Sequence, residues 1–110
     1  MTASPLRTAA AALPPQPASA PLPPAELGAL RSRVRAFIDE CAIPREDMMR
    51  AHDVAWLDHV TRELRPIAQG RGIALPQLPV ADGGLGLCWQ DCAQVFEEAG
   101  RSFLGAGALG

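Results

Sequence analysis

The sequence predicts an all-α fold, because apolar residues recur at helical steps in two separate segments. In the first segment these residues are Leu27, Leu30, Val34, Phe37, Ile38 and Cys41, and in the second they are Cys92, Val95, Phe96 and Ala99. Steps of three and four residues place the apolar side chains on one stripe of a helix. No stretch alternates apolar and polar residues at period two, the pattern of a half-buried strand, so no sheet is expected.

Composition excludes several classes of protein. The 110 residues leave room for one domain. Twelve acids and ten arginines, with no lysine, give a net charge of −2, which argues against electrostatic binding to nucleic acid or an anionic membrane. The longest apolar run, residues 9–14, is far shorter than the ~20 residues of a membrane span. Three irregularly spaced cysteines favour a reducing compartment, so a cytoplasmic location is expected.

Residues 1–24 are predicted to be a disordered Ala/Pro-rich tail. They hold seven of the eleven prolines and no acid, and their small side chains offer little to bury. The segment lacks the apolar core of a secretory signal. A mitochondrial transit peptide stays open as an alternative, although Arg7 is the only basic residue of the segment.

The first helix is predicted over residues 25–42. Pro24 suits its first turn, where a missing N–H group costs nothing. Pro44 is expected to end it, because the residue before a proline is disfavoured in the helical conformation. Arg35 and Asp39 are spaced for an ion pair along this helix.

Two helical pieces are predicted next, over 47–60 and 61–70. The expected buried residues are Met49, Trp56, Leu57 and Val60 in the first piece, and Leu64, Ile67 and Ala68 in the second. Pro66 costs about 3 kcal/mol inside a helix, so we expect a break or kink between the pieces. Gly70 or Gly72 is expected to close the second piece with a left-handed cap.

The remaining chain is predicted to form a loop, a helix and the start of another helical segment. Residues 72–88 are the loop, in which Asp82-Gly83-Gly84-Leu85-Gly86 indicates tight turning or close backbone approach. The helix covers 89–100 and ends at Gly100. Residues 101–110 begin the further helical segment.

Five stretches then occur in an order typical of one family. They are Leu30–Ile38, Ile43–Glu46, Leu64–Gly72, the loop Leu78–Leu87 with its double glycine, and Phe96–Ser102, which reads Phe-Glu-Glu-Ala-Gly-Arg-Ser. Together they resemble the N-terminal domain of acyl-CoA dehydrogenases over about residues 26–110. The chain departs from the usual pattern before the double glycine, where an acid and an aromatic residue are common, and at Cys88 or Trp89, where a Ser or Thr cap is common.

The resemblance implies a partial orthogonal helical bundle over residues 25–110, an incomplete N-terminal helical domain. It also implies a part in acyl-CoA or fatty acid metabolism, as the N-terminal portion of an FAD-dependent oxidoreductase that dehydrogenates acyl-CoA thioesters at the α,β-bond. In that family a middle β-domain and a C-terminal domain hold FAD and the catalytic base. Because the 110 residues include neither domain, this chain alone is expected to be inactive and to retain no FAD, with no catalytic or cofactor-binding residue of its own.

The resemblance also implies that the segment after Gly100-Arg101-Ser102 forms one wall of the pocket for the acyl chain. The residues at those positions are Phe103, Leu104, Ala106 and Leu109. The alternative is a stand-alone or split-subunit helical interaction module without catalysis. Its expected partners are a second copy of the chain or separately encoded dehydrogenase domains.

Other groupings of reactive side chains have plainer interpretations. Cys88 and Cys92 lack further ligands at metal-site spacing and are interpreted as buried thiols. His52 and His59, with Asp53 and Asp58 beside them, are interpreted as solvated helix residues.

Two further groupings concern charge and aromatic residues. Glu97 and Glu98 are expected to pair with Arg101 or to stay in solvent. Trp56 and Trp89 are expected to anchor the core or an interface. The glycine loop lacks the Lys-Ser/Thr of a phosphate-binding loop and is interpreted as a structural turn.

Overall fold

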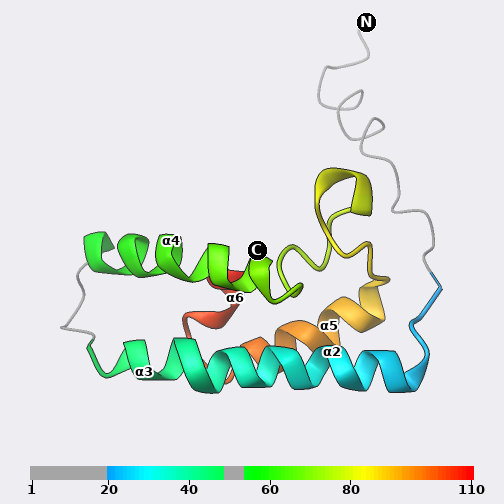
Figure 1. Cartoon of the computed structure of the whole chain (residues 1–110), viewed down its shortest axis with the longest axis horizontal. Coiled ribbons are helices and arrows are strands. Elements are labelled where there is room, and N and C mark those ends of the chain that lie inside the picture. Colours follow the sequence, from blue (N-terminus) through cyan, green and yellow to red (C-terminus); the bar gives the residue numbers. More distant parts are fainter. Residues whose placement is uncertain (1–19, 49–53) are drawn as a thin grey trace, which may run out of the picture.

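The part of the chain described by a computed structural model, residues 20–48 and 54–110, contains helices and loops but no strand, which confirms the predicted all-α class (Figure 1). In chain order the elements are α2 (Pro24–Phe37), the π-helical turn η1 (Ile38–Ala42), α3 (Ile43–Glu46), α4 (Val54–Gly70), the 3₁₀ turn η2 (Val80–Asp82), α5 (Trp89–Ala99) and α6 (Gly105–Leu109). The predicted tail lies outside the described residues as far as residue 19.

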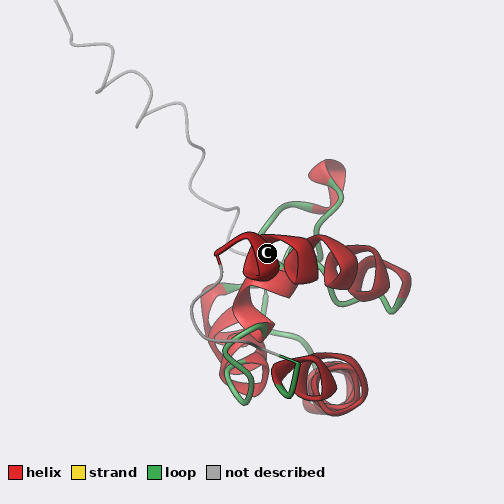
Figure 2. Cartoon of the chain, turned by 90° about the vertical axis from the view of Figure 1, so that its left-hand side faces the viewer, coloured by secondary structure: helices red, strands yellow, loops and turns green. Residues whose placement is uncertain are grey.

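The helices are arranged in a C. α2 packs on α5, α5 packs on α6, and α6 packs on α4. In Figure 2, where α2 is seen nearly end-on, α2 and α4 form the two arms, and α5 with α6 joins them. The position of α6 therefore depends on α4 as well as on α5.

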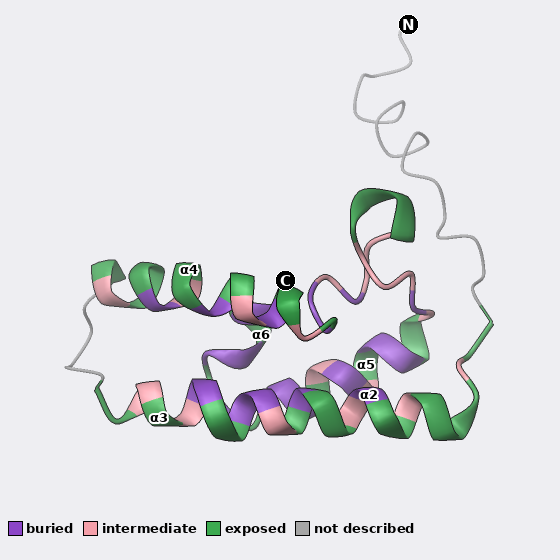
Figure 3. Ribbon diagram, viewed as in Figure 1, coloured by how far each residue is buried: buried purple, intermediate pink, exposed green. Residues whose placement is uncertain are grey.

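A hydrophobic core runs along the inner side of this arrangement (Figure 3). Its buried members are Leu30, Val34, Phe37, Ile38, Cys41, Ala42, Val60, Leu64, Ala68, Ile73, Ala74, Leu87, Cys92, Val95, Ala99, Leu104, Ala108 and Leu109. The predicted stripes of α2 and α5 supply many of these residues, so the helical periodicity identified the buried faces correctly.

The first helical segment does not end before Pro44, so the prediction that this proline ends the helix was wrong. From Pro24 to Glu46 the chain stays helical, because a wider π turn precedes the proline. The N–H of Ile43 donates to the carbonyl of Ile38, five residues back. The widened turn relieves the crowding that a proline ring causes in an α-helix, and Arg45 donates through Nη1 to the carbonyl of Cys41 at 2.8 Å.

α4 continues through Pro66 as one helix, so the predicted break is also wrong. Pro66 is exposed, as is Arg62, four residues earlier. Water can therefore reach this side of the helix and bind the carbonyl that the proline leaves without an N–H partner. The turns of α4 on either side of Pro66 are held by buried Leu64 and Ala68.

The predicted apolar face of α4 is confirmed at its C-terminal half and wrong at its start. Val60 is buried and Trp56 is partly buried, but Leu57 is 41% exposed. α6 packs against α4, with Gly107 close to Thr61, whereas Leu57 lies one turn nearer the start of α4. Met49 lies outside the described residues.

The loop after α4 begins with the predicted left-handed cap. Gly72, with φ of +69°, closes the helix, and the N–H of Ile73 donates to the carbonyl of Ala68 at 3.1 Å. This is the Schellman arrangement, and Ile73 is fully buried beneath it. Of the two predicted glycines, Gly72 rather than Gly70 is left-handed.

Gly84 is required by close backbone approach within the same loop. A Cβ at this position would clash with the carbonyl oxygen of Leu78 and would lie 2.6 Å from that of Leu75. Among the hydrogen bonds that fix the turn are those from Leu85 N–H to Leu75 O at 3.1 Å and from Gly86 N–H to Leu78 O at 2.8 Å. The double glycine therefore lets the loop fold onto its own backbone.

Gly84→Ala is expected to lower the free energy of unfolding by about 2 kcal/mol, because backbone carbonyls cannot turn aside as a flexible side chain can. Urea denaturation followed by circular dichroism measures the loss. Gly28→Ala, in α2, is the matched control: nothing lies within 4 Å of its Cβ position. Alanine there should raise stability by about 0.5–1 kcal/mol. Equal effects at the two positions would contradict the close approach at Gly84.

Candidate functional site

The predicted pocket residues lie on and just before α6, and they divide by burial. Leu104 and Leu109 are buried, whereas Phe103 is 54% exposed and Ala106 is exposed. Ser102 is buried and accepts the N–H of Leu104 at 3.1 Å, which fixes the turn between α5 and α6. The four residues therefore share a segment but not a surface.

Three contacts place α6 against the rest of the domain. Leu75 N–H donates to the carbonyl of Leu109 at 2.6 Å, which joins the glycine loop to the end of the helix. Arg65 of α4 donates through Nε to the carbonyl of Gly107 at 3.3 Å. At its start, Gly105 lies so close to the carbonyl of Ala99 that a side chain would clash.

Leu75 adopts a conformation that bulky residues rarely take. Its φ is +53°, in the left-handed region. Such strain persists only where the surroundings fix it. Here the N–H group is bonded to Leu109, and the carbonyl accepts the N–H groups of Leu78 and Leu85. The strained residue thus connects the loop turn to α6.

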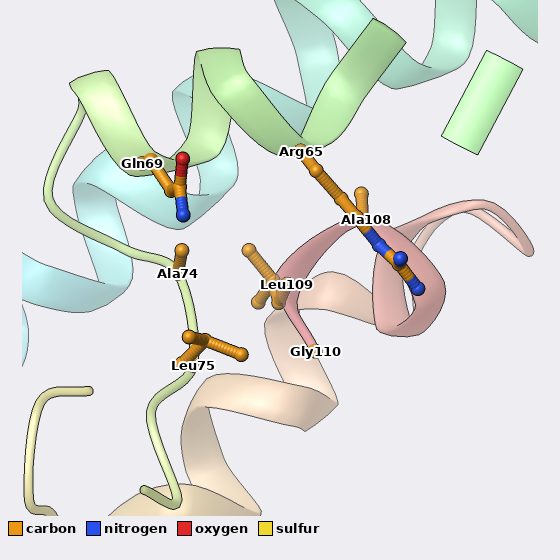
Figure 4. Close-up of a pocket in the computed structure, with 7 residues that line it drawn as sticks. All are labelled: Arg65, Gln69, Ala74, Leu75, Ala108, Leu109 and Gly110. Atoms are coloured by element: carbon orange, nitrogen blue, oxygen red, sulfur yellow. The ribbon is translucent and has the colours of Figure 1, made fainter. Parts of the chain in front are cut away.

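A small cavity of about 170 Å³ lies between α4, the loop and α6 (Figure 4). It is lined by Arg65, Gln69, Ala74, Leu75, Ala108, Leu109 and Gly110. The side chains of Leu75 and Leu109 point toward each other across it. Of the four predicted pocket residues, Leu109 alone lines this cavity.

The main buried charge is Glu98, on α5. Its carboxylate is 5% exposed and accepts hydrogen bonds from Arg31 at 2.9 Å and from Arg35 at 2.9 and 3.3 Å. The hydrogen bonds from Arg35, supported by the charges of both arginines, hold the pKa of Glu98 below its ordinary value of 4.5. The same contact raises the pKa of Arg35.

This cluster differs from the pairings that were predicted. Glu98 binds two arginines of α2 rather than Arg101, and Arg101 binds Asp39 at 2.9 Å. Arg35 therefore pairs across helices rather than with Asp39 along its own. One feature of the sequence could have indicated this cluster. Arg31 and Arg35 are four residues apart, and this spacing places two guanidinium groups on one side of α2.

Asp91 is a second buried acid that the sequence did not single out. It is 3% exposed and accepts the backbone N–H of Leu22 at 2.7 Å. Leu22 lies within the range predicted as tail, two residues before α2 begins. The chain is therefore attached to α5 at this residue.

The cysteines of α5 lie in a partly apolar environment. Cys92 is buried, and burial raises the pKa of its thiol, which lies 3.7 Å from the carbonyl of Leu87. Cys88 is half-buried and directly precedes the first residue of α5. Nowhere in residues 20–48 and 54–110 do three or more His, Cys, Asp or Glu side chains gather as a group able to hold a metal ion.

The remaining reactive residues of α4 lie on its surface. His59 is 72% exposed and lies 3.7 Å from Glu63, and Asp58 pairs with Arg62 at 3.0 Å. His52 and Asp53 lie outside the described residues. None of the helices that the structure describes combines the length and apolarity needed to cross a membrane.

The two tryptophans differ in burial. Trp56 packs partly against the core, whereas Trp89 is 72% exposed at the start of α5. Trp89 is therefore not a core anchor within the described residues.

Glu98→Gln is expected to lower the free energy of unfolding by about 2 kcal/mol at neutral pH, because it removes the charge-assisted hydrogen bonds of a buried carboxylate. The folded pKa lies below the unfolded one, so the carboxylate stabilises the fold above pH 4.5 and loses this effect as the pH falls through the folded pKa. The deficit of Glu98→Gln should therefore shrink below pH 4.5.

Urea denaturation at several pH values measures this difference. Glu97→Gln is the matched control, because the neighbouring carboxylate is exposed and its loss should change stability by less than about 0.5 kcal/mol. Equal losses in the two variants, or a deficit that does not change with pH, would contradict the role of Glu98.

The family model described as acyl-CoA dehydrogenase, N-terminal domain, matches residues 24–110. Comparisons with curated proteins and with solved structures gave no match. The matched range starts at the first residue of α2 and includes α5, the glycine loop and α6. The chain therefore belongs to the acyl-CoA dehydrogenase family, and residues 24–110 are an N-terminal domain of that family.

Proposed function

We propose that this domain is the N-terminal portion of an FAD-dependent acyl-CoA dehydrogenase, which dehydrogenates acyl-CoA thioesters at the α,β-bond. The match of the family model over residues 24–110 carries the proposal. We assign to this domain one wall of the pocket for the acyl chain. The segment that follows Arg101 forms this wall.

Within that wall the four residues have different parts. Phe103 and Ala106 are exposed and apolar, so they are the ones that contact the acyl chain. Leu104 packs into the core behind them, and Leu109 adjoins the cavity beside Leu75. Contact with a hydrocarbon chain needs apolar surface rather than polar groups, and this segment supplies it.

We assign the binding of FAD to no residue of this domain. The pyrophosphate of FAD calls for free cationic or amide donors, but Arg31, Arg35 and Arg101 are already bound to carboxylates of this domain. Glu98 is held as a charged partner of two arginines and does not line the cavity between α4 and α6. We therefore assign this domain no proton or hydride transfer.

Photoaffinity labelling tests the pocket wall. An acyl-CoA with a diazirine at the end of its acyl chain should label the tryptic peptide that follows Arg101, in competition with unlabelled acyl-CoA. Phe103→Ala should reduce this labelling at least about threefold, because apolar contact area is lost. Its free energy of unfolding should change by less than about 0.5 kcal/mol, since Phe103 is largely exposed.

Two controls separate contact from folding. Leu104→Ala should cost about 2–5 kcal/mol of stability, because the side chain is buried. Val80→Ala removes an exposed apolar side chain from the loop and should change neither labelling nor stability. Labelling concentrated in other peptides would contradict the proposed wall.

The purified 110-residue chain is expected to retain no stoichiometric FAD and to reduce no electron acceptor with acyl-CoA, since Arg31, Arg35 and Arg101 are engaged within the domain. Flavin absorbance of the purified chain and an acceptor-reduction assay measure this. A flavin-coloured protein that turns over acyl-CoA would refute the proposal that this domain only forms part of the pocket.

A further inference from the structure

A groove of about 310 Å³ lies on α2, on a different surface from the proposed acyl pocket wall. It is lined by Leu22, Glu26, Ala29, Leu30, Arg33, Leu85 and Leu87. α5 occupies another side of α2, where Arg31 and Arg35 bind Glu98. The groove therefore lies between the N-terminal half of α2 and the glycine loop, with an apolar floor.

Two opposite charges stand at the rim of this groove. Glu26 and Arg33 are seven residues apart, which places them on the same side of α2, two turns and about 10 Å apart along its axis. At that separation they do not pair with each other. No ion pair or side-chain hydrogen bond joins either of them to another residue of the described part of the chain.

The charges of Glu26 and Arg33 are complementary to those of a second α2 helix that runs in the opposite direction. In an antiparallel pair of α2 helices related by a two-fold axis beside Ala29 and Leu30, Glu26 of each copy lies opposite Arg33 of the other. Ala29 stands at the crossing point, and its small side chain allows the helix axes to approach closely. One stretch of eight residues thus supplies both halves of each charge pair.

We propose that this groove is a self-association surface, which binds α2 of a second copy of the chain in antiparallel orientation. The half-buried Leu22 and Leu85 supply apolar area beside the crossing point. The two charge pairs fix the register and direction of the helices, while exposed ion pairs add little affinity. The dimer is therefore weak and reversible, and its formation depends on concentration and on salt.

Sedimentation velocity of the full 110-residue chain over a range of concentrations tests the proposal. The wild-type chain should show a reversible monomer–dimer equilibrium that weakens at high salt. Glu26→Arg and Arg33→Glu each place two like-charged pairs in the homodimer, so each should raise the dissociation constant at least about tenfold. Circular dichroism verifies that both variants keep their helix content.

Charge exchange then separates the proposed pairing from a general loss of affinity. An equimolar mixture of the two single variants should form a heterodimer, because the positive α2 of one matches the negative α2 of the other. The double variant, with Glu26→Arg and Arg33→Glu together, should dimerise like the wild type. Both results require the antiparallel register, which a folding defect would not reproduce.

Matched controls apply the same charge changes to exposed residues elsewhere. Glu97→Arg on α5 and Arg62→Glu on α4 should leave the dissociation constant unchanged. A wild-type chain that stays monomeric at every concentration would overturn the proposal. A mixture that fails to recover the dimer, or controls that weaken it equally, would also overturn it.

Discussion

The carboxylate of Glu98, buried between Arg31 and Arg35, determines how α2 is placed in this domain. α2 packs on α5, and this cluster is the polar part of their interface. A short turn connects α5 to α6, and α6 packs against α4. A charge buried beside an apolar core is tolerated only when it is well paired. The positions of α2 and α4 are therefore set by apolar burial along the core and by the two ion pairs of Glu98 at the side of α2.

Much of this fold could be predicted from the sequence, because helical periodicity is a local property. The stripes of α2 and α5 identified their buried faces, and the glycine loop was correctly placed between helices. The errors came from applying a sound local rule without knowing the surroundings. A proline ends a helix only where the lost hydrogen bond cannot be replaced. At Pro44 a π turn precedes the proline, and at Pro66 the exposed side of α4 lets water replace the lost partner.

The candidate site was harder to predict, since its geometry depends on contacts between distant segments. The resemblance to the family located the segment after Arg101 but could not separate Phe103, which faces solvent, from Leu104, which enters the core. That separation depends on the turn between α5 and α6, which is fixed by the hydrogen bond from the N–H of Leu104 to Ser102. Likewise, Glu98 was expected beside its sequence neighbour Arg101, because nothing local indicates an arginine on another helix.

The same ionic cluster has a consequence for the order of events during synthesis. Its partners are separated by 63 and 67 residues along the chain. At about 5–20 residues per second, a ribosome needs several seconds to reach Glu98 after making the two arginines. Until then the nascent α2 carries two unneutralised guanidinium groups beside an uncovered apolar stripe. The domain therefore depends on its last third to complete the folding of its first helix, and translation that stops within α5 would leave that helix without a place to dock.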